Sequence, residues 1–95
     1  MKYELMILAK PLTNEDVRDK VLSKIEKKII SEKGSFKVVE FSGKRLLAYP
    51  VKKFKEGVYI LCRVEISAEK ATELKKIISL TPEVLRFLLL KEENL

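Results

Sequence analysis

Residues 43–52 combine cations, an aromatic ring and a proline on one otherwise apolar segment. The side chains in question are Lys44, Arg45, Lys52, Tyr49 and Pro50. If this segment is extended, alternate side chains face opposite ways. Pro50 cannot donate a backbone hydrogen bond to a ladder, which predicts an edge strand rather than a central one. We expect such an edge to meet both RNA and protein.

The chain has a net charge of +6, and most of it lies around this segment. Residues 36–56 carry six basic and two acidic side chains, whereas residues 57–95 carry six of each. A local basic cluster is the electrostatic footprint of a partner with a phosphate backbone. A solvated basic surface that serves solubility explains the charge equally well, so charge alone leaves both interpretations open.

Residue types that could carry out catalysis are scarce in this sequence. Cys62 is the single cysteine and histidine is absent, which excludes an internal disulfide, a Cys/His zinc site and most hydrolytic triads. Cys62 shares its strand parity with Ile60 and Val64, so we expect a small core side chain rather than a nucleophile. The three glycines are isolated and form no phosphate-binding loop. We expect no enzyme activity, no metal, no cofactor and no small-molecule substrate.

The length of 95 residues corresponds to one domain, residues 1–95, with a single core. Its longest apolar runs are too short to span a bilayer. No signal peptide precedes the first strand-like segment, residues 3–9. We therefore expect a cytoplasmic protein without a membrane partner.

Hydrophobic periodicity predicts two helices. Thr13 is expected to cap the first one, and Gly34 to follow its end. The apolar stripe of this helix recurs every four residues and comprises Val17, Val21, Ile25 and Ile29. Ser67 is expected to cap the second helix, which Thr81 and Pro82 end.

Four strands are expected, at residues 3–9, 36–51, 58–66 and 84–91. Residues 52–57 are expected to form a hairpin loop longer than the two-residue minimum, and Gly43 to mark a bulge. The order of strands and helices is βαββαβ, which predicts an α+β, ferredoxin-like split βαβ sandwich. Its four-stranded antiparallel sheet has two helices on one face, with the first and third strands central and the other two at the edges.

One face of this sheet has no helix to cover it and yet carries apolar side chains. Met6 and Leu8 in the first strand and Leu88 and Leu90 in the last strand are expected to face that way. An uncovered apolar face is costly in water, so it is a candidate partner surface. Coverage by loops or by the tail is an equally open alternative.

Several short motifs resemble those of the bacterial small-subunit ribosomal protein six family. They are Tyr-Glu-Leu-x-Ile at residues 3–7, Gly-x-Arg-x-Leu-Ala-Tyr-Pro-Val-x-Lys at residues 43–53, Gly-Val-Tyr at residues 57–59, and the segment at residues 84–91. Together they span almost the whole chain, and the second motif is quite specific. The resemblance implies the ferredoxin-like fold and a non-catalytic component of the small ribosomal subunit.

Membership of this family implies two partners. The protein would form a heterodimer with small-subunit protein eighteen and, together with it, bind the central domain of 16S ribosomal RNA. On this basis the residues expected to contact RNA are Lys44, Arg45, Lys52 and Lys53, with a second group of Lys2, Tyr3, Arg86 and Lys91. The residues expected to contact the protein partner are Leu47, Ala48, Tyr49 and Pro50. A guanidinium can hold a phosphate through two hydrogen bonds, so each arginine should matter more than any one lysine.

A different class of protein would use the same sheet face for self-association, namely a small-molecule-sensing or dimerising ferredoxin-like module. Salt separates the two functions. An RNA component binds with an affinity that falls steeply as salt rises, whereas a ligand-binding module shows a saturable thermal shift with little salt dependence.

Overall fold

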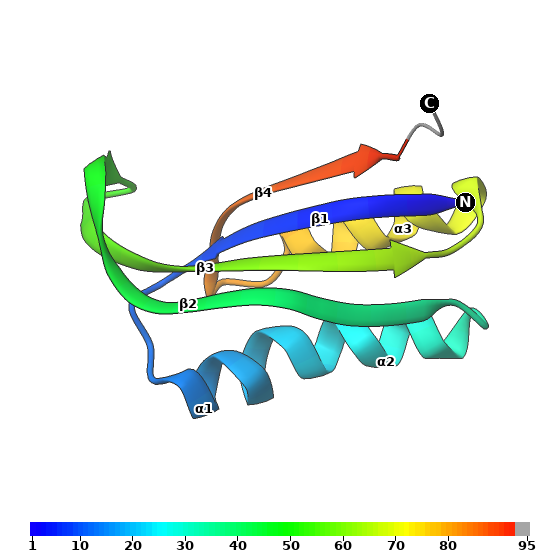
Figure 1. Cartoon of the computed structure of the whole chain (residues 1–95), viewed down its shortest axis with the longest axis horizontal. Coiled ribbons are helices and arrows are strands. Elements are labelled where there is room, and N and C mark those ends of the chain that lie inside the picture. Colours follow the sequence, from blue (N-terminus) through cyan, green and yellow to red (C-terminus); the bar gives the residue numbers. More distant parts are fainter. Residues whose placement is uncertain (93–95) are drawn as a thin grey trace.

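The computed structural model describes residues 1–92 of the chain. Their elements are, in order, β1 (Lys2–Ala9), α1 (Asn14–Val17), a π-helical segment η1 (Arg18–Leu22), α2 (Ser23–Ser31), β2 (Ser35–Val51), β3 (Phe54–Glu65), α3 (Ala68–Ser79) and β4 (Val84–Lys91). Within the described residues the strands form one four-stranded sheet in the order β2, β3, β1, β4, and each neighbouring pair is antiparallel. Figure 1 shows α3 behind this sheet and α2 along β2. The predicted α+β, ferredoxin-like fold is confirmed, with β2 and β4 at the edges.

The main core lies between the helices and one face of the sheet. Its fully buried strand residues include Leu5, Ile7, Ile60 and Cys62. Leu5 lies opposite Cys62 and Ile7 opposite Ile60, so strand alternation puts all four on the same face. Cys62 is therefore a core side chain, as predicted, and burial raises the pKa of its thiol to about 12.

The first helical run, from α1 to α2, contains a π-helical turn that the sequence pattern does not predict. The run begins as expected, because the N–H of Asp16 donates to Thr13 Oγ1 at 3.1 Å. The apolar stripe repeats every four residues, whereas a regular α-helix has about 3.6 residues per turn, so the stripe would drift around the helix. A π-turn joins residues five apart, holds more residues per turn and offsets this drift. The whole stripe is consequently buried: Val17, Val21, Ile25 and Ile29.

The chain leaves α2 through a left-handed residue. Gly34 follows the end of the helix, as predicted, but Lys33 is the residue with a positive φ, of 60°. The N–H of Lys33 donates to the carbonyl of Ile30 and that of Gly34 to the carbonyl of Ile29, both at 2.9 Å, as in a Schellman motif. Gly34 is needed for another reason, since a Cβ at that position would collide with the carbonyl oxygen of Glu65 in β3.

The second long helix, α3, starts and ends where the sequence predicts, but its cap differs. Ser67 precedes the helix, yet its hydroxyl makes no capping hydrogen bond. Its carbonyl oxygen accepts hydrogen bonds from the N–H groups of Lys70, at 3.1 Å, and Ala71, at 3.0 Å. At the far end the hydroxyl of Thr81 donates to the carbonyl of Ile77 at 2.9 Å, just after the helix.

An ion-pair network joins α2 to α3. Lys28 Nζ lies 2.9 Å from a carboxylate oxygen of Glu32 and 3.2 Å from one of Glu73, and Lys70 Nζ lies 3.5 Å and 3.7 Å from the same two carboxylates. The hydrogen bond from Lys28 lowers the pKa of Glu32. The stabilisation through Glu32 is therefore present above the ordinary pKa of 4.5 and is lost as the pH falls through the lower folded-state value.

The connection between β2 and β3 corrects the loop prediction. The expected loop over residues 52–57 is wrong, because β3 begins at Phe54 and Val51 pairs with Phe54 across a turn of Lys52 and Lys53. The two lysines have φ values of 47° and 72°. A two-residue hairpin turn with positive φ at both positions usually has the sequence Asn-Gly, so a Lys-Lys pair gives no sequence signal for it.

We expect two substitutions after α2 to differ in their effect on stability. Gly34→Ala drives a Cβ against the Glu65 carbonyl and should lower the free energy of unfolding by about 1–3 kcal/mol. Lys33→Gly relieves a left-handed backbone that costs an L-residue roughly 1–2 kcal/mol, and should be neutral or stabilising after the added entropy of the unfolded chain. Urea denaturation measures both changes. A clear loss of stability in Lys33→Gly would contradict this description of the helix end.

We expect the Cys62 thiol of the folded protein to resist thiol reagents at mildly alkaline pH, because the side chain is fully buried and its pKa is about 12. A chromogenic disulfide reagent should label it slowly in buffer and rapidly in concentrated guanidinium chloride. The neutral thiol also favours folding below its ordinary pKa of 9.0, and this contribution is lost as the pH rises above that value. Labelling of the native protein at the denatured rate would show that the thiol is accessible.

Candidate RNA and protein interface

The outer half of the β2–β3 hairpin forms an arm, residues 43–57, that leaves the plane of the sheet. The bend begins at Gly43, which has a φ of 70° and lies where the β2–β3 register shifts between Phe41 and Lys44. This confirms the predicted bulge. Beyond the bulge the two strands pair again, with Arg45 opposite Gly57. Figure 1 shows the arm rising across the end of the sheet towards the β4 side.

A small apolar cluster, here called the arm cluster, holds the arm on the sheet face that the helices leave open. Its buried members are Leu8, Leu47, Val51 and Leu85. Gly57 permits the close approach, because a Cβ there would lie 2.7 Å from Leu8 Cδ1 and 2.9 Å from the carbonyl oxygen of Ala9. Lys10 Nζ lies 5.6 Å from the ring centroid of Phe54, which packs against the cluster. Packing therefore fixes the position of the arm.

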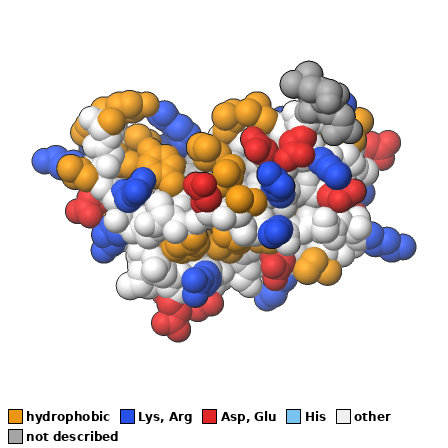
Figure 2. Space-filling model, viewed as in Figure 1, with side chains coloured by type: hydrophobic (Ala, Val, Ile, Leu, Met, Phe, Trp, Pro, Cys, Tyr) orange, Lys and Arg blue, Asp and Glu red, His pale blue; other side chains and the backbone are white. Residues whose placement is uncertain are grey.

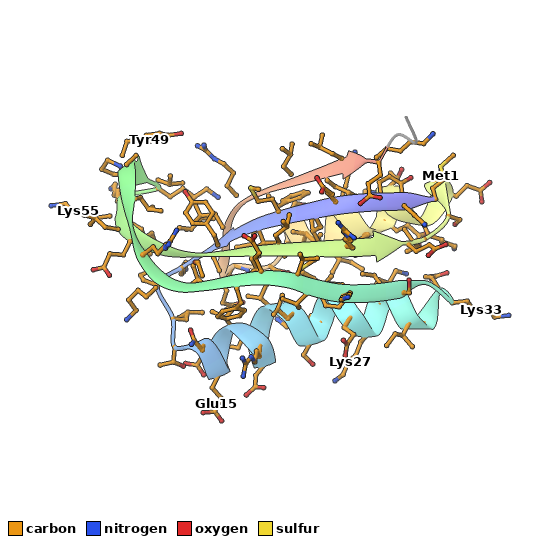
Figure 3. The ribbon with its side chains drawn as sticks, viewed as in Figure 1. Met1, Glu15, Lys27, Lys33, Tyr49 and Lys55 are labelled. Atoms are coloured by element: carbon orange, nitrogen blue, oxygen red, sulfur yellow. The ribbon has the colours of Figure 1, made fainter. Side chains whose placement is uncertain are left out.

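The cations that the sequence predicts for the arm are all exposed: Lys44, Arg45, Lys52 and Lys53. Lys55, which the sequence analysis does not select, is exposed on the same arm, and Figure 3 shows it pointing away from the molecule. Its position within a basic run could have been taken as a signal. Among the described residues these five cations form no salt bridge.

The second predicted RNA-contacting group is split between two ends of the sheet. Arg86 lies opposite Leu8 and so stands beside the arm. Lys91 lies opposite Tyr3, next to Lys2, at the other end of β1. The distance along β1 from Lys2 to Leu8 is about 20 Å at the usual rise of a strand. The structure therefore places Arg86 beside the arm and separates it from the Lys2 and Lys91 pair.

Two of the residues predicted to make contacts are buried. Tyr3 is 8% exposed and belongs to the main core, where its hydroxyl lies 3.7 Å from Sδ of Met1. Leu47 is also 8% exposed, because it belongs to the arm cluster. Ala48, Tyr49 and Pro50 are exposed, and Tyr49 is 62% accessible at the top of the arm (Figure 3). These three residues thus form the accessible part of the predicted protein-binding segment.

A groove of about 230 Å³ runs between the arm and β4. Its lining joins Leu47, Ala48, Tyr49 and Val51 of the arm to Met6, Leu8, Tyr59, Arg86, Phe87 and Leu88 of the sheet. In Figure 2 hydrophobic side chains surround a notch at this place. Met6, Tyr59 and Leu88 are 40–53% exposed; Met6 and Leu88 belong to the apolar face expected as a candidate partner surface, whereas Tyr59 is absent from the predicted site. The signal for them is strand parity, since all three share a face with Leu8.

The open sheet face is apolar near the arm and carries both charged and apolar side chains at its other end. Met6 and Leu88 lie opposite each other and remain exposed, whereas the arm buries Leu8. Farther along, Glu4 of β1 lies opposite Arg63 of β3. Leu90 of β4, opposite Glu4, is also exposed, as expected for this face. The hairpin covers one portion of the apolar face, as in the second of the two explanations, and a partner on the open portion stays a prediction.

Comparisons with known proteins agree with this architecture. The family model described as ribosomal protein S6 matches residues 2–91. Small ribosomal subunit protein bS6 of Gloeobacter violaceus is 35% identical over 94 residues, which cover 98% of this chain and 97% of that protein. Protein bS6 of Halalkalibacterium halodurans is 32% identical over 93 residues, with 98% of each chain covered.

A solved structure shows the same similarity in three dimensions. The 30S ribosomal protein S6 of Thermotoga maritima superposes with a TM-score of 0.74 at 32% identity, covering 96% of this chain and 86% of that one. Within residues 1–92 the structure contains no helix of sufficient length and apolarity to cross a bilayer.

The fold, the basic arm and these similarities define a ribosomal protein of the small subunit, a structural component rather than an enzyme. The chain belongs to the ribosomal protein S6 family, as its sequence motifs indicate.

We expect the double substitution Lys52→Asn and Lys53→Gly to stabilise the protein by about 1 kcal/mol, because Asn-Gly is the preferred sequence for a turn with two positive φ values. Urea denaturation measures the change in midpoint. Lys55→Asn is the matched control, since it removes a cation from the same arm and leaves the turn unchanged. A double variant with an unchanged or lower midpoint would show that the two lysines do not strain the turn.

Proposed function

We propose that this protein binds the central domain of 16S ribosomal RNA as a heterodimer with small-subunit protein eighteen, in ribosomes of the cytoplasm. The proposal treats residues 1–95 as one binding domain. The observation that carries it is the arm, which sets five exposed cations next to an exposed apolar groove. A surface of this kind suits a partner pair in which one member offers phosphates and the other offers apolar side chains.

In this proposal the arm contacts the RNA backbone through Lys44, Arg45, Lys52 and Lys53, with Arg86 beside it. The two guanidinium groups supply paired hydrogen bonds to phosphate, and the lysines act as point charges. Lys2 and Lys91 provide a second contact about 20 Å away along β1. Two such contacts fix the orientation of a protein on folded RNA without reading its sequence. Tyr3 is buried, so its part in RNA binding reduces to holding Lys2 and Lys91 in place.

The apolar groove and the outer arm form the proposed surface for protein eighteen. Tyr49 is the natural anchor, because exposed aromatic rings that become buried contribute strongly to protein interfaces. Ala48 and Pro50 flank it on the arm, and Leu47 supports them from below. Met6 and Leu88 of the open sheet face extend this apolar surface. The partner would thereby cover the remaining apolar half of the face.

Binding to a central-domain fragment of 16S RNA, measured across a salt series with and without protein eighteen, tests the proposal. We expect tight, partner-dependent binding that weakens steeply as salt rises. Arg45→Ala should weaken binding roughly tenfold and reduce the salt slope by about one unit. Tyr49→Ala should reduce the effect of the partner while leaving the salt slope nearly unchanged.

The matched control is Lys27→Ala, which removes an exposed cation from α2, far from the arm (Figure 3). It should leave RNA binding almost unchanged. Equal losses in Arg45→Ala and Lys27→Ala would mean that overall charge, rather than the arm, binds the RNA. Absence of partner-dependent binding with both proteins folded would overturn the proposal and turn attention to self-association.

A further inference from the structure

The part of β2 before the bend, residues 35–42, is an open sheet edge distinct from the arm. β2 is the outermost strand of the sheet, so no described strand pairs with its outer side. An edge strand presents backbone N–H and C=O groups to any extended chain that runs alongside it. Val38 and Val39, at the centre of the segment, are 36% and 41% exposed. Hydrogen-bonding groups and apolar side chains are thus available together.

Opposite charges flank this apolar centre on the open face. Lys37 lies opposite Arg63 and Glu40 opposite Leu61, which are two residues apart in β3, so Lys37 and Glu40 project from the same face. Among residues 1–92 neither side chain takes part in a salt bridge. Arg63, opposite Lys37, has Glu92 as its partner at 3.8 Å and Glu4 on its other side, which leaves Lys37 to pair with a carboxylate brought alongside β2.

A groove on the helix side of the same strand also has a positive and a negative side chain, in the reverse order to Lys37 and Glu40 along the strand. The groove measures about 330 Å³ and lies between β2 and the first helical run, with Phe36, Val38, Phe41 and Leu22 among its lining residues. The guanidinium of Arg18 lies 5.4 Å from the Phe41 ring centroid at one end. Glu26 also lines the groove, and because the helix runs antiparallel to β2 (Figure 1), it lies towards the Phe36 end.

We propose that residues 35–42 bind an extended peptide segment of a partner protein as a fifth, antiparallel strand. The segment has an acidic residue opposite Lys37, a basic residue opposite Glu40 and two β-branched residues between them. Larger apolar residues at its two ends enter the groove. The backbone supplies affinity, and the two charges fix the register and direction of the added strand.

The sequence of β2 itself meets these requirements. Lys37 and Glu40 share a face because β2 has a register shift between Val38 and Glu40. In an antiparallel register centred between Val38 and Val39, a copy of residues 35–42 that adopts the same bulge sets its glutamate opposite Lys37 and its lysine opposite Glu40. A whole second molecule does not fit, because α2 packs along β2 at this edge and the second molecule would bring its own α2 to the same place (Figure 1). A peptide without flanking helices avoids this clash.

A synthetic peptide with the sequence of residues 35–42 is therefore the probe. Titration into isotope-labelled full-length protein, followed by amide NMR, should shift signals of residues 35–42 and of Arg18 and Glu26. The protein variant Lys37→Glu with Glu40→Lys places like charges at both contacts, and should bind the peptide about fivefold or more weakly. The peptide carrying the same exchange should restore binding to that variant, which also shows that the variant is folded.

The control exchanges two charges on α3, Lys75→Glu with Glu69→Lys, and should leave peptide binding unchanged. Equal affinity of both peptides for both proteins would overturn the proposal, because charge would then not set the register. Shifts confined to the arm would place the peptide elsewhere and overturn it as well. Sedimentation of the free protein as a dimer that the Lys37→Glu, Glu40→Lys exchange leaves intact would show that a whole copy occupies the edge instead.

Discussion

The contact between the arm and Leu8 is the constraint on which the functional surface depends. Gly43 bends β2 out of the sheet, and Gly57 lets the returning strand approach β1 more closely than any side chain would permit. The resulting cluster buries Leu8 and Leu47 on a face that has no helix to cover it. Because the arm packs there, Leu47, Ala48, Tyr49 and Val51 form one wall of a groove that Arg86 also lines. Without this contact the same residues would extend into solvent with no shared surface.

Ion pairing of the cations differs between two parts of the surface. Where α2 meets α3, Lys28 and Lys70 share the carboxylates of Glu32 and Glu73. On the arm the cations have no such partners among the described residues. Lys27 of α2 is likewise exposed and forms no salt bridge there, so the arm is distinguished by its place beside the apolar groove and not by unpaired charge alone.

Much of this structure follows from local sequence patterns, and the exceptions have physical causes. Strand alternation and helical spacing were sufficient to predict the strand order, the edge position of Pro50 and the burial of Cys62. They could not reveal the tight turn, because Lys52 and Lys53 occupy positions that usually need Asn and Gly. Strand parity assigns Leu47 to a face, but its burial depends on the bend at Gly43, which joins residues distant in sequence. Site residues that depend on such a bend lie beyond any local pattern.

The arm cluster and the main core are separate bodies of apolar contact. Four buried residues hold the arm, whereas the helices and the opposite sheet face share a much larger core. Local opening of a protein costs less free energy where fewer apolar contacts must break. The arm can therefore lift from the sheet while the rest of the molecule stays folded, and a bound partner that bridges arm and sheet would oppose this motion. Binding of such a partner would therefore slow the hydrogen exchange of amides in the arm without changing the shape of the protein.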